Sequence, residues 1–186
     1  MKAILYTALA ATIALPGVAN AQAASSSPEQ NPISTALKSS QKRAERNLVG
    51  SAESMPAGKY DFKPTPAQMS FGQLMLHVAG SNEFMCSTIS GQKAPQREKL
   101  TPTAGKDKVV ERLKQSFDYC TSALSNVDDS KLGETVPFFG GRSISRGGAM
   151  MGLAEDWADH YGAAAIYLRL NGILPPSARG RNAEGM

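Results

Sequence analysis

The chain has 186 residues and a formal net charge of +4, a length at which one domain can bury a core without metal or disulfides. Its basic residues are scattered along the sequence rather than gathered into a stripe with aromatic side chains between them. This distribution argues against a nucleic-acid-binding surface, so we expect no nucleic-acid partner.

The first 21 residues have the pattern of a secretory signal peptide. Lys2 precedes an apolar run over residues 3–15, and Ala19 and Ala21 provide a small-residue cleavage site. We expect cleavage after Ala21 and an exported protein, periplasmic if the source is a Gram-negative bacterium and otherwise secreted. The apolar run is short for a bilayer span, so no membrane association is expected after cleavage. An uncleaved membrane anchor is the alternative.

Residues 22–32 are small and polar, which predicts a flexible leader, and residues 179–186 have the composition of a disordered tail. Between them, residues 33–178 are expected to form one domain.

Four segments of this domain have apolar residues at helical spacing, namely residues 33–55, 70–91, 109–124 and 150–172. The first apolar stripe begins at Ile33. Ser70 and Gln73 form a capping-box signature at the start of the second segment, and Gly91 is expected to end it. No segment has the alternation of a convincing strand. The sequence therefore predicts an all-α fold, a four-helix bundle.

The connection between the second and third predicted helices is long. Its roughly 14 residues could extend about 45 Å, whereas a 20-residue helix is about 30 Å long. A tight antiparallel hairpin normally needs only about 2–8 residues. The connection can therefore run the length of the bundle and leave these two helices parallel.

The two cysteines, Cys86 and Cys120, lie at similar depths in these two helices. If the helices are parallel, the residues differ by only about 3 Å along the axis, and an oxidising compartment favours a disulfide between them. If the helices are antiparallel neighbours, the cysteines are too far apart. Two buried free thiols are then the alternative.

The chain contains two histidines, His77 and His160, and each lies beside the apolar stripe of its helix. Asp156 lies on the same side as His160, one helical turn earlier. Side chains four residues apart can converge on one ion, and a ligand from a facing helix can complete the set. One interpretation is a two-histidine, one-carboxylate site for Zn, Fe(II), Ni or Mn. In the other, Asp156 and His160 are solvated flank residues and His77 is a hydrogen-bonded interface residue.

Three segments occur in a characteristic order, "ESMPAGKYDFKPTPAQMSFGQLMLHVAGSNEFMCS", "LKQSFDYCTSAL" and "DWADHYGAAAIYLRLNGILPPSA". With them, the chain resembles the DinB/YfiT-like family over residues 33–178. The resemblance implies a four-helix bundle with a long crossover between helices two and three. Many members hold a divalent metal with three histidines. His77 matches the first of these and His160 the last, whereas Asp156 stands at the position of the middle one.

A carboxylate in place of an imidazole lowers the net charge of a metal centre by one. We therefore expect a less acidic bound water and better acceptance of Mn²⁺ or Fe²⁺. The resulting hypothesis is an exported DinB-like protein that binds a divalent metal and acts as a metal-dependent transferase or hydrolase on an unknown small molecule. The alternative is a non-catalytic, metal-free bundle that binds a small molecule or a protein. A homodimer formed through an exposed helix face is compatible with either hypothesis.

Overall fold

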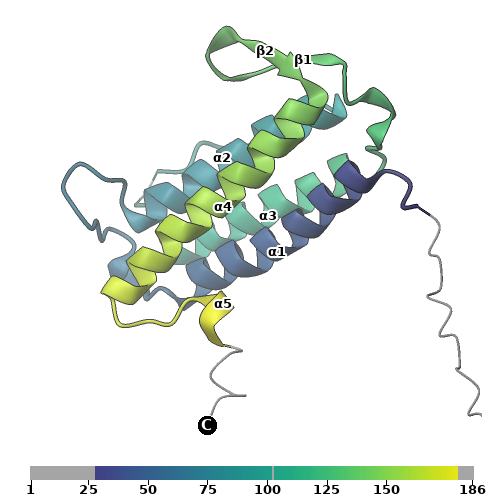
Figure 1. The fold of residues 1–186 in the computed structure, drawn as a ribbon. Coiled ribbons are helices and arrows are strands. Elements are labelled where there is room, and N and C mark those ends of the chain that lie inside the picture. Colours follow the sequence, from purple (N-terminus) through teal and green to yellow (C-terminus); the bar gives the residue numbers. More distant parts are fainter. Residues whose placement is uncertain (1–27, 102, 180–186) are drawn as a thin grey trace, which may run out of the picture.

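The computed structural model describes residues 28–101 and 103–179. The predicted signal peptide, the leader up to residue 27 and the tail from residue 180 lie outside the described residues. Four long helices form the bundle (Figure 1): α1 (Pro32–Ser54), α2 (Phe71–Ser90), α3 (Lys106–Leu124) and α4 (Arg146–Leu170). α1 packs against α3 and α4, and α2 packs against the same two helices from the other side. The all-α prediction is confirmed.

Short helices, turns and strands lie at the two ends of the bundle. A short helix, α5 (Pro176–Arg179), follows α4, and an antiparallel pair of strands, β1 (Thr135–Pro137) and β2 (Ser143–Ser145), precedes it. Single 3₁₀ turns occupy Ala57–Lys59, Asp129–Lys131 and Phe139–Gly141. The expectation of no strand was wrong, because three-residue strands are too short to produce a readable alternation.

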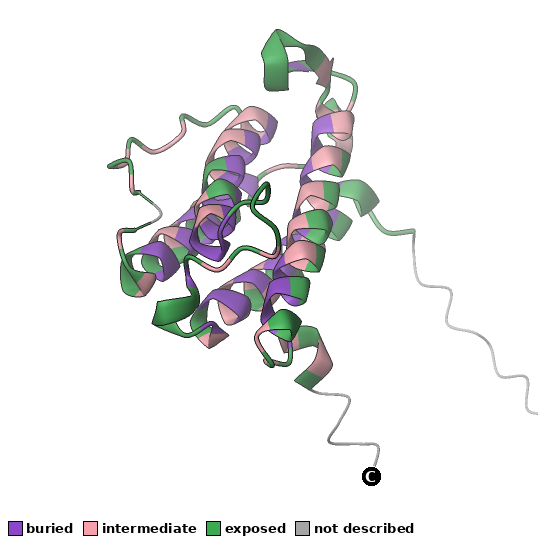
Figure 2. Ribbon diagram, turned by 90° about the vertical axis from the view of Figure 1, so that its left-hand side faces the viewer, coloured by how far each residue is buried: buried purple, intermediate pink, exposed green. Residues whose placement is uncertain are grey.

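The buried residues lie on the sides of the helices that face one another (Figure 2). In α1, the predicted stripe is buried from Leu37 to Met55. Ile33 is the exception and is 39% exposed, because it lies in the first turn of α1 at the end of the bundle. Among the described residues, none of the helices is long and apolar enough to cross a membrane.

The predicted ends of α2 are confirmed. The Ser70 hydroxyl accepts a hydrogen bond from the Gln73 backbone N–H, and the Gln73 side chain accepts one from the Ser70 N–H. Gly91 ends the helix with φ of 75°, a conformation that favours glycine. α4, in contrast, begins at Arg146, four residues before the predicted start. Its first turn is rich in glycine and shows no apolar periodicity, so sequence patterns could not identify it.

α2 and α3 are parallel, as the long crossover predicts. The Asn82 amide donates a hydrogen bond to the Ser116 hydroxyl at 3.0 Å, and a disulfide joins Cys86 to Cys120. Both pairs are separated by 34 residues, and a constant separation requires helices that run in the same direction. The connection between the two helices accordingly runs along one side of the bundle, from the end of α2 to the start of α3 (Figure 2).

A buried polar contact joins this pair of helices to α4. The Trp157 indole N–H donates a hydrogen bond to the Asn82 side-chain oxygen at 2.7 Å, and both residues are buried. Asn82 thereby connects α2, α3 and α4 near the middle of the bundle. Its hydrogen bonds fix how far α4 can slide against α2, which matters because the candidate metal ligands lie on these two helices.

Candidate metal site

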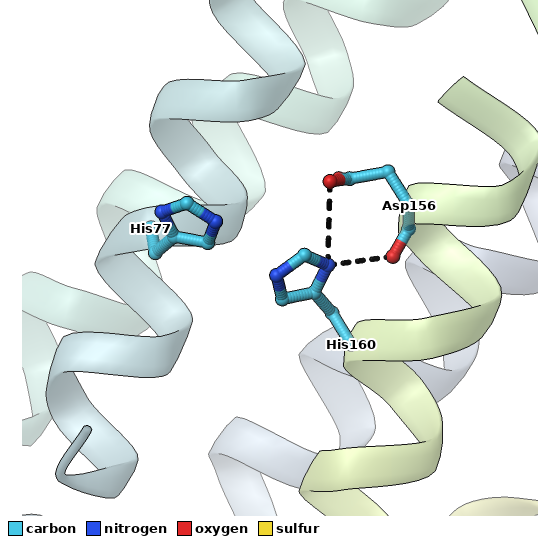
Figure 3. A group of neighbouring side chains, drawn as sticks. All are labelled: His77, Asp156 and His160. Carbon is cyan, nitrogen blue, oxygen red and sulfur yellow. Dashed lines mark hydrogen bonds and ion pairs between the residues drawn. The ribbon is translucent and has the colours of Figure 1, made fainter. Parts of the chain in front are cut away.

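The three predicted ligands come together between α2 and α4. α2 and α4 are antiparallel. Met85 of α2 lies against Gly152 of α4, and His77 lies against His160. From the first pair to the second, the residue number falls by eight in α2 and rises by eight in α4. His77 projects from α2, and Asp156 and His160 project from successive turns of α4 (Figure 3). This helix pairing explains why residues 79 positions apart in the sequence can share one site.

Each of the three residues offers one ligand atom, and these atoms all lie within 4.8 Å of one another. The imidazole rings of His77 and His160 have centroids 4.8 Å apart and planes inclined at 42°. Ligand atoms around one tetrahedral ion lie roughly 3.5 Å apart, given bonds of about 2.0–2.2 Å. Side-chain movements of about 1 Å would therefore bring all three residues into coordination distance.

The His160 ring is held in the tautomer that a metal ligand needs. Its Nδ1 atom lies 2.6 Å from the backbone carbonyl oxygen of Asp156. A carbonyl oxygen can only accept, so Nδ1 carries a proton, and in the neutral ring Nε2 is then the nitrogen with a free lone pair. Nε2 faces the His77 ring (Figure 3). Histidine ligands are commonly oriented by such a hydrogen bond from the second ring nitrogen to a backbone carbonyl.

Asp156 contributes a partly buried carboxylate whose hydrogen bonding is incomplete. One oxygen lies 3.4 Å from His160 Nδ1, and the other, Oδ2, is buried without a hydrogen-bond partner among the described residues. Burial raises the pKa of this carboxyl group, His160 and His77 oppose the rise, and the charge of Asp159 adds to it. A buried carboxylate oxygen without a partner is unfavourable, and a bound cation would supply the missing interaction. The residues present therefore fit a divalent cation.

The site is open to solvent on one side, since His77 is exposed whereas Asp156 and His160 are partly buried. A cation held here could therefore exchange ligands with the solution.

We expect replacement of Asp156 by asparagine to stabilise the metal-free protein at neutral pH. A carboxyl group whose pKa is raised by folding from its ordinary value of 3.8 destabilises the native state above that pH, because the unfolded chain ionises first. The stabilisation should disappear as the pH falls below that value. Urea unfolding at several pH values measures it, with Glu155→Gln, the replacement of an exposed carboxylate on the same helix, as the control. A variant no more stable than the wild type at neutral pH would contradict this account of the site.

A groove of about 430 Å³ borders His77 on the side away from α4. Lys99 of the crossover and Arg112 of α3 line it, together with apolar side chains of α2. Sequence analysis missed these two residues, because the crossover has no regular pattern and nothing in the sequence predicts which segment it covers.

Comparison with known proteins identifies the family. Residues 41–164 match the model of the DinB superfamily. No match was found among curated proteins.

Two solved structures share the fold. A DinB-like protein from Bacillus subtilis is 18% identical, with a TM-score of 0.60 over 74% of this chain and 92% of its own. A conserved protein from Enterococcus faecalis is 16% identical, with a TM-score of 0.59 over 72% of this chain and 94% of its own. At these identities, the similarity establishes the fold alone.

Proposed function

Because the chain belongs to the DinB superfamily, we propose that it binds a divalent cation through His77, Asp156 and His160. The observation that carries this proposal is the orientation of His160, whose Nδ1 is occupied by a backbone carbonyl while Nε2 faces the second imidazole. The unpartnered oxygen of Asp156 supports it independently. Three protein ligands leave coordination positions open, as in catalytic rather than structural metal sites.

We further propose that the protein catalyses a metal-dependent reaction, by hydrolysis or group transfer, on a small molecule. A divalent cation supplies Lewis acidity and lowers the pKa of bound water. The protein's part is to hold the cation between α2 and α4, on the side where His77 is exposed and a substrate has access. The carboxylate of Asp156 reduces the net charge of the centre, which moderates both effects.

We propose that this reaction takes place outside the cytoplasm. The signal-peptide pattern of residues 1–21 motivates this proposal, and the buried disulfide between Cys86 and Cys120 supports it, because such bonds persist mainly in oxidising compartments. Low-molecular-weight thiols are scarce there, which favours hydrolysis over transfer to a thiol. Mass spectrometry of the protein from its native host should give a mature chain that begins at Gln22. A mature chain that still begins at Met1 would contradict export by cleavage.

The metal preference provides the test of the proposed site. Titration of metal-free protein with Mn²⁺ and Zn²⁺ is expected to raise the unfolding temperature, since a ligand that binds only the native state stabilises it by about 2.7 kcal/mol at 100 times its Kd. In Asp156→His, which has three imidazole ligands, the preference should shift toward Zn²⁺ and away from Mn²⁺. Asp159→His, on the exposed side of α4, is the control and should behave like the wild type.

If no divalent cation stabilised the wild type, the metal proposal would be contradicted. The non-catalytic binding module would then be the better description of this bundle.

A further inference from the structure

We infer that the groove beside His77 binds an amphipathic organic anion, and that this anion belongs to the substrate class of the metal site. The groove lies on the outer face of α2, between that helix, the crossover and α3, and measures about 430 Å³. Ligand pockets for small molecules typically measure about 300–1,000 Å³. The assignment to a substrate rests on the proposed metal-dependent function, whereas the binding of an anion does not.

His77 connects the groove to the metal site. Gln73 and Gly80, four residues before and three residues after it, line the groove from the same side of α2. His77 therefore borders the groove, while its ring lies beside the His160 ring of α4 (Figure 3). A molecule that fills the groove would contact His77, the one proposed metal ligand among the groove residues.

The charges that line the groove favour an anion. They are those of Lys99, Arg112 and Glu83, and the Glu83 carboxylate forms a salt bridge with Arg97 at 2.6 Å. Arg112 donates a hydrogen bond to the backbone carbonyl of Glu98. Among the described residues, neither Lys99 nor Arg112 forms a salt bridge. The charges of these two groove residues are therefore not neutralised by a salt bridge, and a divalent cation at His77 would add positive charge beside them.

Two other carboxylates lie near Arg112 but do not line this groove. Glu98 and Glu111 border an adjoining hollow, which Lys108 also lines and which shares Leu100 and Arg112 with the groove. Their charges reduce the positive potential around Arg112 without occupying the space in which a ligand would lie. The net charge on the groove side stays positive.

Apart from Gln73 and His77, the remaining lining is apolar and includes a glycine that leaves space. Leu76 and Leu100 face the groove from α2 and from the crossover. Gly80 lies inside α2, where glycine is unfavourable relative to alanine, yet no atom lies within 4 Å of a Cβ built at this position. Gly162 of α4 is equally open but is not among the groove residues. An open glycine is therefore not by itself evidence for a ligand site. At position 80, the missing side chain makes room beside two leucines and two cations.

The test uses the dye 1-anilinonaphthalene-8-sulfonate, which combines an apolar body with one negative charge. Its neutral relative, N-phenyl-1-naphthylamine, lacks the sulfonate. Wild-type protein should bind the anionic dye saturably, and Lys99→Gln/Arg112→Gln should weaken this binding by about tenfold or more, with little effect on the neutral dye. Gly80→Leu fills the groove and should weaken the binding of both dyes. Gly162→Leu and Lys108→Gln are the matched controls.

Metal content and circular dichroism, measured for every variant, should stay unchanged. Anionic-dye affinities that are the same in the wild type, Gly80→Leu and the double variant would overturn the groove as an anion site, as would binding that does not saturate.

Comparison of metal-free with metal-loaded protein separates the two proposals. The anionic dye should bind the metal-loaded form about threefold or more tightly, because a cation bound to His77 adds positive charge beside the groove. Equal affinities would overturn the link to the metal site. If the protein takes up no metal, dye binding that still depends on Lys99, Arg112 and Gly80 would establish the anion site and refute only the metal proposal.

Discussion

Replacement of both Cys86 and Cys120 by alanine is expected to destabilise the protein by about 4 kcal/mol. The disulfide closes a loop that spans 34 residue positions, and in the chain-entropy model a loop of this length contributes about 3–4 kcal/mol at 25 °C. Both cysteines are fully buried, so the loss of two sulfur atoms from the core adds to the effect. Urea unfolding of the oxidised wild type and of the double variant measures the difference.

Two features distinguish this effect from ordinary core damage. Reduction of the wild-type disulfide under unfolding conditions should reproduce most of the loss without any change in sequence. Ser87→Ala, on the same helix and only half buried, is the control and should change stability by less than about 1 kcal/mol. A double variant destabilised by no more than this control would contradict the contribution assigned to the cross-link between α2 and α3.

The second large effect is expected at His160, whose replacement by alanine should weaken divalent metal binding by more than about 100-fold. The loss of an outer partner of a metal ligand typically costs about 10–100-fold in affinity, and the loss of a direct ligand should cost more. The variant also frees the Asp156 carbonyl that orients the ring. Competition between the protein and a chelating indicator dye measures the affinity.

The control for this variant is Asp159→Ala, which removes an exposed carboxylate one residue before His160. It should leave the affinity within about threefold of the wild type, as expected for a screened surface charge. If His160→Ala bound metal as tightly as Asp159→Ala, then Asp156 and His160 would be polar residues on a helix flank, and the cation would lie elsewhere.

The helices could be predicted because their local signals agree with their packing. The apolar stripe that runs from Leu37 to Met55 is buried, and Ser70 and Gln73 cap α2 as their spacing predicts. The length of the crossover allowed parallel α2 and α3, although by itself it left antiparallel neighbours as an alternative. The sequence did not predict β1 and β2, because strands of three residues produce no measurable periodicity.

The candidate ligands could be named from spacing and from family resemblance, but the arguments for and against metal binding depend on the fold. The direction of the His160 ring is set by a hydrogen bond to the backbone of Asp156, which no residue pattern predicts. The incomplete hydrogen bonding of Asp156 depends on how far α4 buries it. The groove forms only because the crossover brings Lys99 and Leu100 over α2, and a loop without regular structure gives no sign of its path.

The central claim is that His77, Asp156 and His160 hold a divalent cation. Elemental analysis of the mature protein, purified without chelators and without a histidine tag, tests it most directly when His160→Ala is analysed in parallel. We expect near-stoichiometric divalent metal in the wild type and almost none in the variant. Metal in neither protein, even after incubation with Zn²⁺, Ni²⁺, Mn²⁺ and Fe²⁺, would contradict the claim, and so would equal metal in both.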